Sequence, residues 1–155
     1  MTGVWPREKG RQRTKGAGLS LITRSGIRRR QTVLIADDDP NLRALVHNSI
    51  ESPYYLVIEA CDGEEAWTLI KERKPTLVLL DLKMPRRSGL EVLAAIRADP
   101  ELRGTQVMVL TASAQQADIE AGVLAGADFY LTKPFSPDDL LARVSEAIGR
   151  RVPSW

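Results

Sequence analysis

The stretch Val33-Leu34-Ile35-Ala36-Asp37-Asp38-Asp39-Pro40 decides the fold, because four apolar residues run directly into three aspartates. Consecutive β-branched and aliphatic residues are typical of strands in a parallel sheet that helices cover on both faces. The same arrangement recurs where Leu77-Val78-Leu79-Leu80 runs into Asp81. We therefore expect the acids at the carboxyl ends of two buried strands, in the crevice where open α/β sheets bind ligands.

Five apolar strand segments alternate with five amphipathic helical segments. The expected strands cover residues 32–37, 54–59, 76–80, 105–110 and 128–131. The expected helices cover residues 40–52, 62–73, 89–98, 114–125 and a last segment that begins at 137. Strands that alternate with helices over short connections predict an α/β fold with right-handed crossovers and three layers.

Asp39 followed by Pro40 is typical of a helix cap and a first helical residue. The apolar residues of the first and last helices are expected to pack on the sheet; they are Leu42, Leu45, Val46, Ile50, Leu140, Leu141, Val144 and Ile148.

Charge divides the chain unequally. Residues 1–31 hold nine Lys or Arg and one acid, whereas residues 32–155 hold thirteen Lys or Arg and nineteen acids. The first segment has too little apolar material to offset the entropy cost of ordering it. We expect a basic, flexible N-terminal extension over 1–31, one folded domain over 32–150 and a short tail over 151–155.

Apolar runs are too short for a secretory signal, which needs about 7–15 residues, or for a membrane span, which needs about 18. The single cysteine, Cys61, has no partner for an internal disulfide bond. These features predict a cytoplasmic protein that does not associate with membranes.

Polar residues gather at the expected strand ends. Asp37 and Asp38 follow the first strand, Asp81 the third, Thr111 the fourth and Lys133 the fifth. Neighbouring carboxylates repel one another unless a cation lies among them, and oxygen ligands without His or Cys favour Mg²⁺. A magnesium ion, an ammonium group and a hydroxyl around one carboxylate could hold a phosphoryl group, for which that carboxylate could be the nucleophile.

Four motifs stand at these strand ends: Ile35-Ala36-Asp37-Asp38-Asp39-Pro40, Leu79-Leu80-Asp81-Leu82-Lys83-Met84-Pro85, Val109-Leu110-Thr111-Ala112, and Gly126-Ala127-Asp128-Phe129-Tyr130-Leu131-Thr132-Lys133-Pro134-Phe135. In this order and spacing they resemble the receiver domain of two-component response regulators, over residues 32–150. The resemblance implies a flavodoxin-like fold, a five-stranded parallel sheet of order 2-1-3-4-5 flanked by five helices, of the CheY-like, stand-alone kind.

The resemblance also implies a role for each acid. Asp81 would accept a phosphoryl group from a histidine of a partner protein. Asp38, Asp81 and the backbone carbonyl of Lys83 would bind Mg²⁺, and Asp37 would hold the ion through water.

Four further residues match positions of the same family. Thr111 and Lys133 would contact phosphoryl oxygens, and Tyr130 matches the aromatic residue that swings inward when Thr111 is drawn to the phosphate. Pro134 matches the family's cis proline.

The implied function is that of a single-domain response regulator rather than an enzyme, with only its own phosphotransfer and dephosphorylation. Its donor would be a sensor histidine kinase or a histidine phosphotransfer protein. Phosphorylation would shift the fourth helix, the fifth strand and the last helix, which form the face for a downstream protein. We expect a monomer that could dimerise on phosphorylation.

Three alternatives stay open. The chain could pass the phosphoryl group onward as a phosphorelay intermediate. It could be a Mg²⁺-dependent small-molecule phosphatase, although such enzymes need an acidic group two residues beyond the nucleophile, where Lys83 stands. The basic extension could bind nucleic acid, but without a recognition helix such binding would be non-specific and sensitive to salt.

Overall fold

A five-stranded parallel sheet forms the centre of the molecule in the computed structural model, which describes residues 22–23, 26–27, 29–112 and 116–149. The strands are β3 (Gln31–Ala36), β4 (Tyr55–Ala60), β5 (Leu77–Asp81), β6 (Gln106–Thr111) and β7 (Phe129–Thr132). Their order across the sheet is β4-β3-β5-β6-β7, and every neighbouring pair is parallel. Counted within this sheet, the order is 2-1-3-4-5, so the predicted topology is confirmed.

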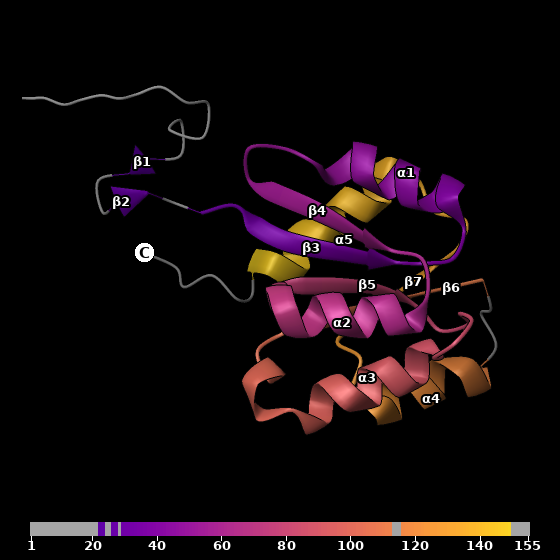
Figure 1. Cartoon of the computed structure of the whole chain (residues 1–155). Coiled ribbons are helices and arrows are strands. Elements are labelled where there is room, and N and C mark those ends of the chain that lie inside the picture. The colour runs from indigo at the N-terminus through magenta and orange to yellow at the C-terminus, as the bar shows by residue number, and fades with distance from the viewer. Residues whose placement is uncertain (1–21, 24–25, 28, 113–115, 150–155) are drawn as a thin grey trace, which may run out of the picture.

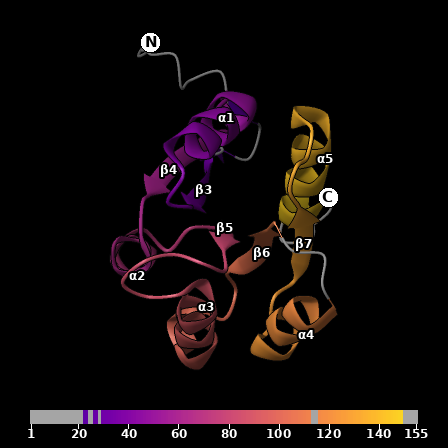
Figure 2. The same ribbon diagram turned by 90° about the vertical axis from the view of Figure 1, so that its right-hand side faces the viewer.

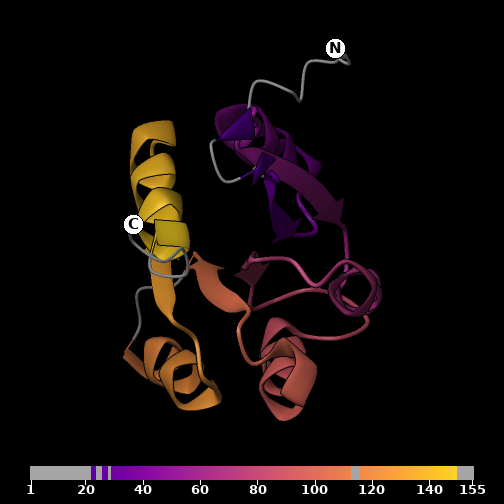
Figure 3. The same ribbon diagram turned by 90° about the vertical axis from the view of Figure 1, so that its left-hand side faces the viewer.

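Helices cover both faces of this sheet, as the ribbon shows (Figure 1). They are α1 (Pro40–Ile50), α2 (Gly63–Arg73), α3 (Gly89–Ala98), α4 (Gln116–Ala125) and α5 (Pro137–Gly149), with a short 3₁₀ helix, η3 (Pro100–Leu102), after α3. Figures 2 and 3 look along the strands, with α1 and α5 on one side of the sheet and α2, α3 and α4 on the other. The three-layer α/β architecture is therefore confirmed.

The apolar runs of the strands fill two separate cores. Val33 and Ile35 of β3 pack with α1 and α5, whereas Leu34 and Ala36 pack with α2 and α3. Alternate side chains of a strand point to opposite faces, so a strand covered on both faces must be apolar at every position.

Polar caps start the helices that follow β3 and β5. The side chain of Asp39 accepts a hydrogen bond from the Asn41 amide, and Pro40 is the first residue of α1. The side chain of Ser88 caps α3 by accepting from the amide of Glu91, whose own side chain accepts from the Ser88 amide. These caps fix where α1 and α3 begin at the carboxyl edge of the sheet.

Four strands end one residue later than the sequence predicted. Asp81 and Thr111 are the last residues of β5 and β6, where they pair with Leu110 and Thr132, and do not follow these strands. For β5, β6 and β7 the prediction was wrong because it ended each strand with its apolar run, whereas the ladder joins backbone groups and continues through polar side chains. The first strand, β3, ends at Ala36, one residue earlier than the predicted 32–37.

Two leucines predicted to be buried are partly exposed. Leu45 of α1 is 38% exposed and Leu141 of α5 is 40% exposed. Each residue turns a helix by about 100°, so Leu45 and Leu141 stand about 100° away from the buried Val46 and Leu140, at the margin of the apolar stripe.

The predicted N-terminal extension is described only in part. Its described residues include β1 (Ile22–Thr23) and β2 (Gly26–Ile27), which form a two-stranded antiparallel sheet that the sequence analysis did not anticipate. Residues 1–21, which were predicted to be flexible, and the predicted tail 151–155 lie outside the described residues. Among the helices described, none is both long and apolar enough to cross a membrane.

Candidate functional site

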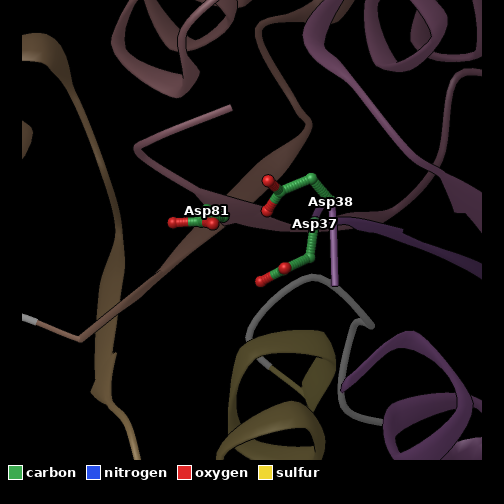
Figure 4. A group of neighbouring side chains, drawn as sticks. All are labelled: Asp37, Asp38 and Asp81. Carbon is green, nitrogen blue, oxygen red and sulfur yellow. The ribbon is translucent and has the colours of Figure 1, made fainter. Parts of the chain in front are cut away.

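Three carboxylates meet at the carboxyl edge of the sheet (Figure 4). Asp37 and Asp38 follow β3, and Asp81 ends the adjacent strand β5. One carboxylate oxygen of each lies within 4.8 Å of the other two. Asp37 is fully buried, Asp81 is 9% exposed, and Asp38 is exposed to solvent. The cluster therefore has buried walls and one side open to a ligand.

Lys133, the residue after Thr132 of β7, brings a positive charge into this cluster. Its Nζ lies 2.8 Å from Oδ2 of Asp37 and 3.7 Å from Oδ2 of Asp81. Partial burial by itself would lower the pKa of Lys133, but the hydrogen bond to Asp37 and the charges of Asp81 and Asp38 outweigh that effect and raise the pKa. Lys133 therefore stays charged and neutralises part of the acidic cluster.

The pKa of the Asp81 carboxyl group is raised above its ordinary value. Burial raises the pKa, because the charged form loses hydration. The Lys83 amide, which donates to Oδ1 of Asp81 at 3.2 Å, and the charge of Lys133 act against this rise, whereas Asp37 and Asp38 add to it. A cation among the three carboxylates would remove this penalty on the ionised form.

Other polar contacts hold Asp37, the first residue after β3. The Asp39 amide donates to Oδ1 of Asp37 at 2.9 Å, so one Asp37 oxygen is bonded within its own loop and the other to Lys133. Nη1 of Arg43, in the first turn of α1, donates to the backbone carbonyl of Asp37 at 2.7 Å. Sequence reasoning missed Arg43, although a positive charge near a helix N-terminus opposes the helix dipole and is a signal of another role.

Thr111 and Pro134 lie beside the cluster. Thr111 is the last residue of β6, next to β5, and it is 5% exposed. The Lys133 amide donates to the Thr111 carbonyl at 2.8 Å, and the peptide bond between Lys133 and Pro134 is cis. The side chain of Lys83 is exposed, whereas its backbone amide donates a hydrogen bond to Oδ1 of Asp81.

Tyr130 lies apart from the carboxylates, in β7, and its ring packs on the core beneath α2 and α3. Its hydroxyl donates to the carbonyl of Ile119 in α4. An added Cβ on Gly122 of α4 would lie 2.1 Å from that hydroxyl. Gly122 therefore makes the room that Tyr130 occupies, which sequence reasoning did not anticipate.

The donor set fits a hard divalent cation. The cluster offers only carboxylate oxygens, and its open side leaves room for the water molecules that Mg²⁺ usually keeps. Asp81 lies where such a cation and Lys133 could both act on a group bound to its carboxylate.

The family model of the response regulator receiver domain matches residues 33–145. The chain belongs to the response regulator receiver family. The family model begins at the third residue of β3 and ends within α5. The matched region therefore includes the whole central sheet apart from the first two residues of β3.

Named relatives agree with this membership. The DNA-binding response regulator MtrA of Mycolicibacterium smegmatis is 37% identical over 121 residues, which cover 78% of this chain and 52% of MtrA. The phosphate regulon transcriptional regulatory protein PhoB of Pseudomonas aeruginosa is 35% identical over 79% of this chain and 54% of PhoB. The receiver chain thus spans about half the length of the curated relatives it matches.

Solved structures give the same fold. The receiver domain of the Francisella response regulator 1452 superimposes with a TM-score of 0.73 at 32% identity, over 79% of this chain and all of that one. The chemotaxis response regulator CheY4 of Vibrio cholerae superimposes with a TM-score of 0.72 at 28% identity, over 76% of this chain and 98% of CheY4. The CheY-like, flavodoxin-like fold predicted from the sequence is therefore confirmed.

Proposed function

We propose that this receiver domain accepts a phosphoryl group on Asp81 and thereby switches a protein-binding face. The observation that carries the proposal is the meeting of Asp37, Asp38 and Asp81 with Lys133 at one edge of the sheet. Two acidic neighbours destabilise a buried carboxylate by repulsion, unless a cation lies among them. A site that binds a cation beside the phosphoryl acceptor accounts for all three acids.

The proposed chemistry is a transfer between two nucleophiles. An oxygen of Asp81 attacks the phosphorus of a phosphohistidine, the bond from phosphorus to nitrogen breaks, and the histidine nitrogen leaves with the bond's electron pair. Lys133 pairs with one phosphoryl oxygen, and the hydroxyl of Thr111 contacts another. The product is an acyl phosphate on Asp81, and its hydrolysis by water restores the carboxylate.

Asp38, Asp81 and the backbone carbonyl of Lys83 would hold Mg²⁺, with Asp37 acting through water. When bound, the ion supplies positive charge that reduces the repulsion between the carboxylates and an incoming phosphoryl group. Asp39 has a different part, because its side chain already caps α1.

The proposed output depends on Tyr130 and Thr111. Phosphorylation adds about −1.5 to −2 charges and new acceptor oxygens beside Thr111. In the present structure Tyr130 packs against Gly122 of α4. A shift of Thr111 toward the phosphate would change the balance between this arrangement of α4 and β7 and a second one. The face of α4, β7 and α5 then presents a changed surface to a downstream protein.

The donor proposed is a sensor histidine kinase or a histidine phosphotransfer protein. The stand-alone arrangement, the cytoplasmic location and the monomeric state stay predictions, and the matched residues cover only 52% of MtrA and 54% of PhoB.

Acetyl phosphate tests the proposal directly. With Mg²⁺, the wild-type chain should gain one phosphoryl group by intact mass and lose it over time, and Asp81→Asn should gain none. Asp39→Asn is the matched control, because asparagine caps a helix as well as aspartate does, and it should be modified like the wild type. Equal modification of Asp81→Asn and wild type would contradict the proposal.

Two alternatives give different results in related assays. A phosphatase would turn over other phosphoesters continuously, whereas a receiver is modified once. A phosphorelay intermediate would lose its phosphoryl group rapidly to a histidine phosphotransfer protein.

MtrA is by name a DNA-binding protein. For this chain we expect no sequence-specific DNA binding, and comparing DNA retention at low salt with and without residues 1–31 tests that expectation.

A further inference from the structure

The loop between β5 and α3, residues 82–88, determines where the main chain of Lys83 lies. The Lys83 amide donates to Asp81 at 3.2 Å, and the Lys83 carbonyl is the ligand that the proposed function assigns to Mg²⁺. The inference below rests on that proposed function. It concerns residues that do not touch the carboxylates but hold this loop in place.

The first residue of α2 lies directly against the loop. A Cβ added to Gly63 would lie 1.8 Å from the backbone oxygen of Arg87, and the Gly63 amide donates to the Pro85 carbonyl at 3.4 Å. Any side chain at position 63 would therefore push the helix and the loop apart. The glycine permits backbone to meet backbone at this point.

Two ion pairs join the same two segments. Nε of Arg86 lies 3.2 Å from Oδ2 of Asp62, and Nε of Arg87 lies 3.3 Å from Oε1 of Glu64. Asp62 also caps α2, because its Oδ1 accepts from the Glu65 amide at 2.8 Å. One carboxylate thus fixes the start of α2 with one oxygen and the loop with the other.

Arg86 adopts a backbone conformation that needs support. Its φ of 72° lies in the left-handed region, which residues with a side chain rarely occupy. The Arg87 amide donates to the Pro85 carbonyl at 2.8 Å, so the chain turns tightly at Arg86. The pair with Asp62 is the contact by which the Arg86 side chain is tied to α2.

The opposite end of the loop is anchored on Asp81 itself. A Cβ added to Gly89, the first residue of α3, would lie 2.1 Å from the Asp81 carbonyl oxygen, and the Gly89 amide donates to the Leu82 carbonyl at 2.9 Å. The loop is therefore held between α3 at its ends and α2 along its middle.

We propose that Asp62, Gly63 and Arg86 are positioning residues for the metal site. They hold the loop so that the Lys83 main chain stays next to Asp81, and thereby set the affinity of the site for Mg²⁺. Loss of either contact leaves the carboxylates unchanged and lets the loop move away from them.

The test is an NMR titration with Mg²⁺ that follows the amides of Lys83 and Asp38. Exposed ion pairs contribute about 0.2–1 kcal/mol, so Arg86→Ala and Asp62→Asn should each raise the Kd for Mg²⁺ up to about fivefold. The double variant should be no weaker than the weaker single variant, because both remove one contact. Gly63→Ala should raise the Kd more than about tenfold, which corresponds to about 1.4 kcal/mol. The effect is larger because the added Cβ would lie 1.8 Å from the Arg87 oxygen and would force the loop away from α2.

Matched controls come from the same chain. Lys74 and Glu101 form an exposed ion pair, with 2.8 Å between Nζ and Oε1, and neither residue belongs to the loop or contacts it through this pair. An added Cβ on Gly149 would meet nothing within 4 Å. Lys74→Ala and Gly149→Ala should bind Mg²⁺ like the wild type. Asp62→Asn keeps the cap of α2, so it removes the pair without removing the helix start.

A second readout separates positioning from general stability. The rate of modification by acetyl phosphate should fall at low Mg²⁺ in Arg86→Ala and return to the wild-type rate at saturating Mg²⁺. A merely structural role would lower Tm and leave the Kd unchanged.

Two results overturn the inference, and they differ in reach. In the first result, the wild type binds Mg²⁺, Asp81→Asn weakens that binding, and Arg86→Ala and Gly63→Ala keep the wild-type Kd. This result overturns the positioning role and leaves the proposed metal site standing. Absence of Mg²⁺ binding in the wild type overturns the proposed metal site as well.

Discussion

Replacing Asp81 with asparagine should stabilise the metal-free protein. The substitution keeps the shape of the side chain and an oxygen that can accept from the Lys83 amide. It removes one negative charge from a cluster that holds Asp37 and Asp38. Burial and the neighbouring carboxylates both disfavour this charge, whereas Lys133 attracts it, so the expected gain is at least the repulsion less the attraction.

The magnitude follows from the distances. Two unit charges at the 4.8 Å limit of the cluster repel by about 0.9 kcal/mol in water and about 3.5 kcal/mol at an effective dielectric constant of about 20. Lys133, at 3.7 Å, attracts Asp81 by about 1.1 to 4.5 kcal/mol over the same range. Two repulsions exceed one attraction by about 0.6 to 2.5 kcal/mol. Because Asp38 is exposed and screened by water, we expect about 1 kcal/mol, or roughly 4 °C in Tm.

The gain should depend on pH in a defined direction. The pKa of Asp81 is raised in the folded state, chiefly by burial, so folded Asp81 binds a proton more readily than unfolded Asp81. Wild-type stability from this group is complete below the unfolded pKa, about 3.9, and is lost as pH rises through the folded pKa. The advantage of the variant should therefore be small near pH 4 and largest at neutral pH.

Urea unfolding in EDTA, at several pH values, measures the difference. Glu101→Gln is the control, because that carboxylate is 72% exposed and far from the cluster, and its change should stay within about 0.5 kcal/mol. A variant less stable than the wild type at neutral pH, or a gain that does not vary with pH, would refute the reasoning. Added Mg²⁺ should stabilise the wild type more than the variant and so reduce the difference.

Three further outcomes follow from other contacts. Lys133→Ala should cost about 3 kcal/mol in urea unfolding at neutral pH, because it leaves the buried carboxylate of Asp37 without its cation; a cost below about 1 kcal/mol would show that water replaces the ammonium group. Gly122→Ala should displace the Tyr130 hydroxyl, because the added Cβ would lie 2.1 Å from it. NMR of the Tyr130 ring would detect the change of environment, and an unchanged spectrum would contradict the packing of Tyr130 on Gly122. Arg97→Ala should cost about 2–3 kcal/mol in thermal unfolding. The Arg97 guanidinium donates to the carbonyls of Gly126 and Thr105, at 2.9 and 2.7 Å, and to Oδ2 of Asp128 at 2.6 Å. A loss within about 0.5 kcal/mol would mean that water replaces these contacts.

Much of the fold could be read from local patterns. The apolar run before Asp37 and the run before Asp81 predicted buried parallel strands, and Asp39 followed by Pro40 predicted the start of α1. Strand ends were harder to place, because Asp81 and Thr111 continue the backbone ladder after the apolar run has ended. Leu45 shows the same limit for a helix, since one residue step separates a buried position from the margin of the stripe.

The candidate site was predictable as a set of strand ends, but its internal contacts were not. Asp37 and Lys133 are 96 residues apart in the chain and form the shorter of the two lysine contacts, whereas the sequence pointed to a phosphoryl group on Asp81 as the partner of Lys133. The contact of Arg43 with the Asp37 carbonyl depends on how α1 leaves the sheet.

The sequence by itself determined the order of strands and helices, the layers and the edge where the acids meet, because hydrophobic periodicity and caps act over a few neighbouring residues. Only the tertiary structure decided that Gly63 lies against the loop after Asp81 and that Gly122 makes room for Tyr130. Such contacts depend on how distant backbones approach one another within a close-packed interior, and no local pattern specifies that distance.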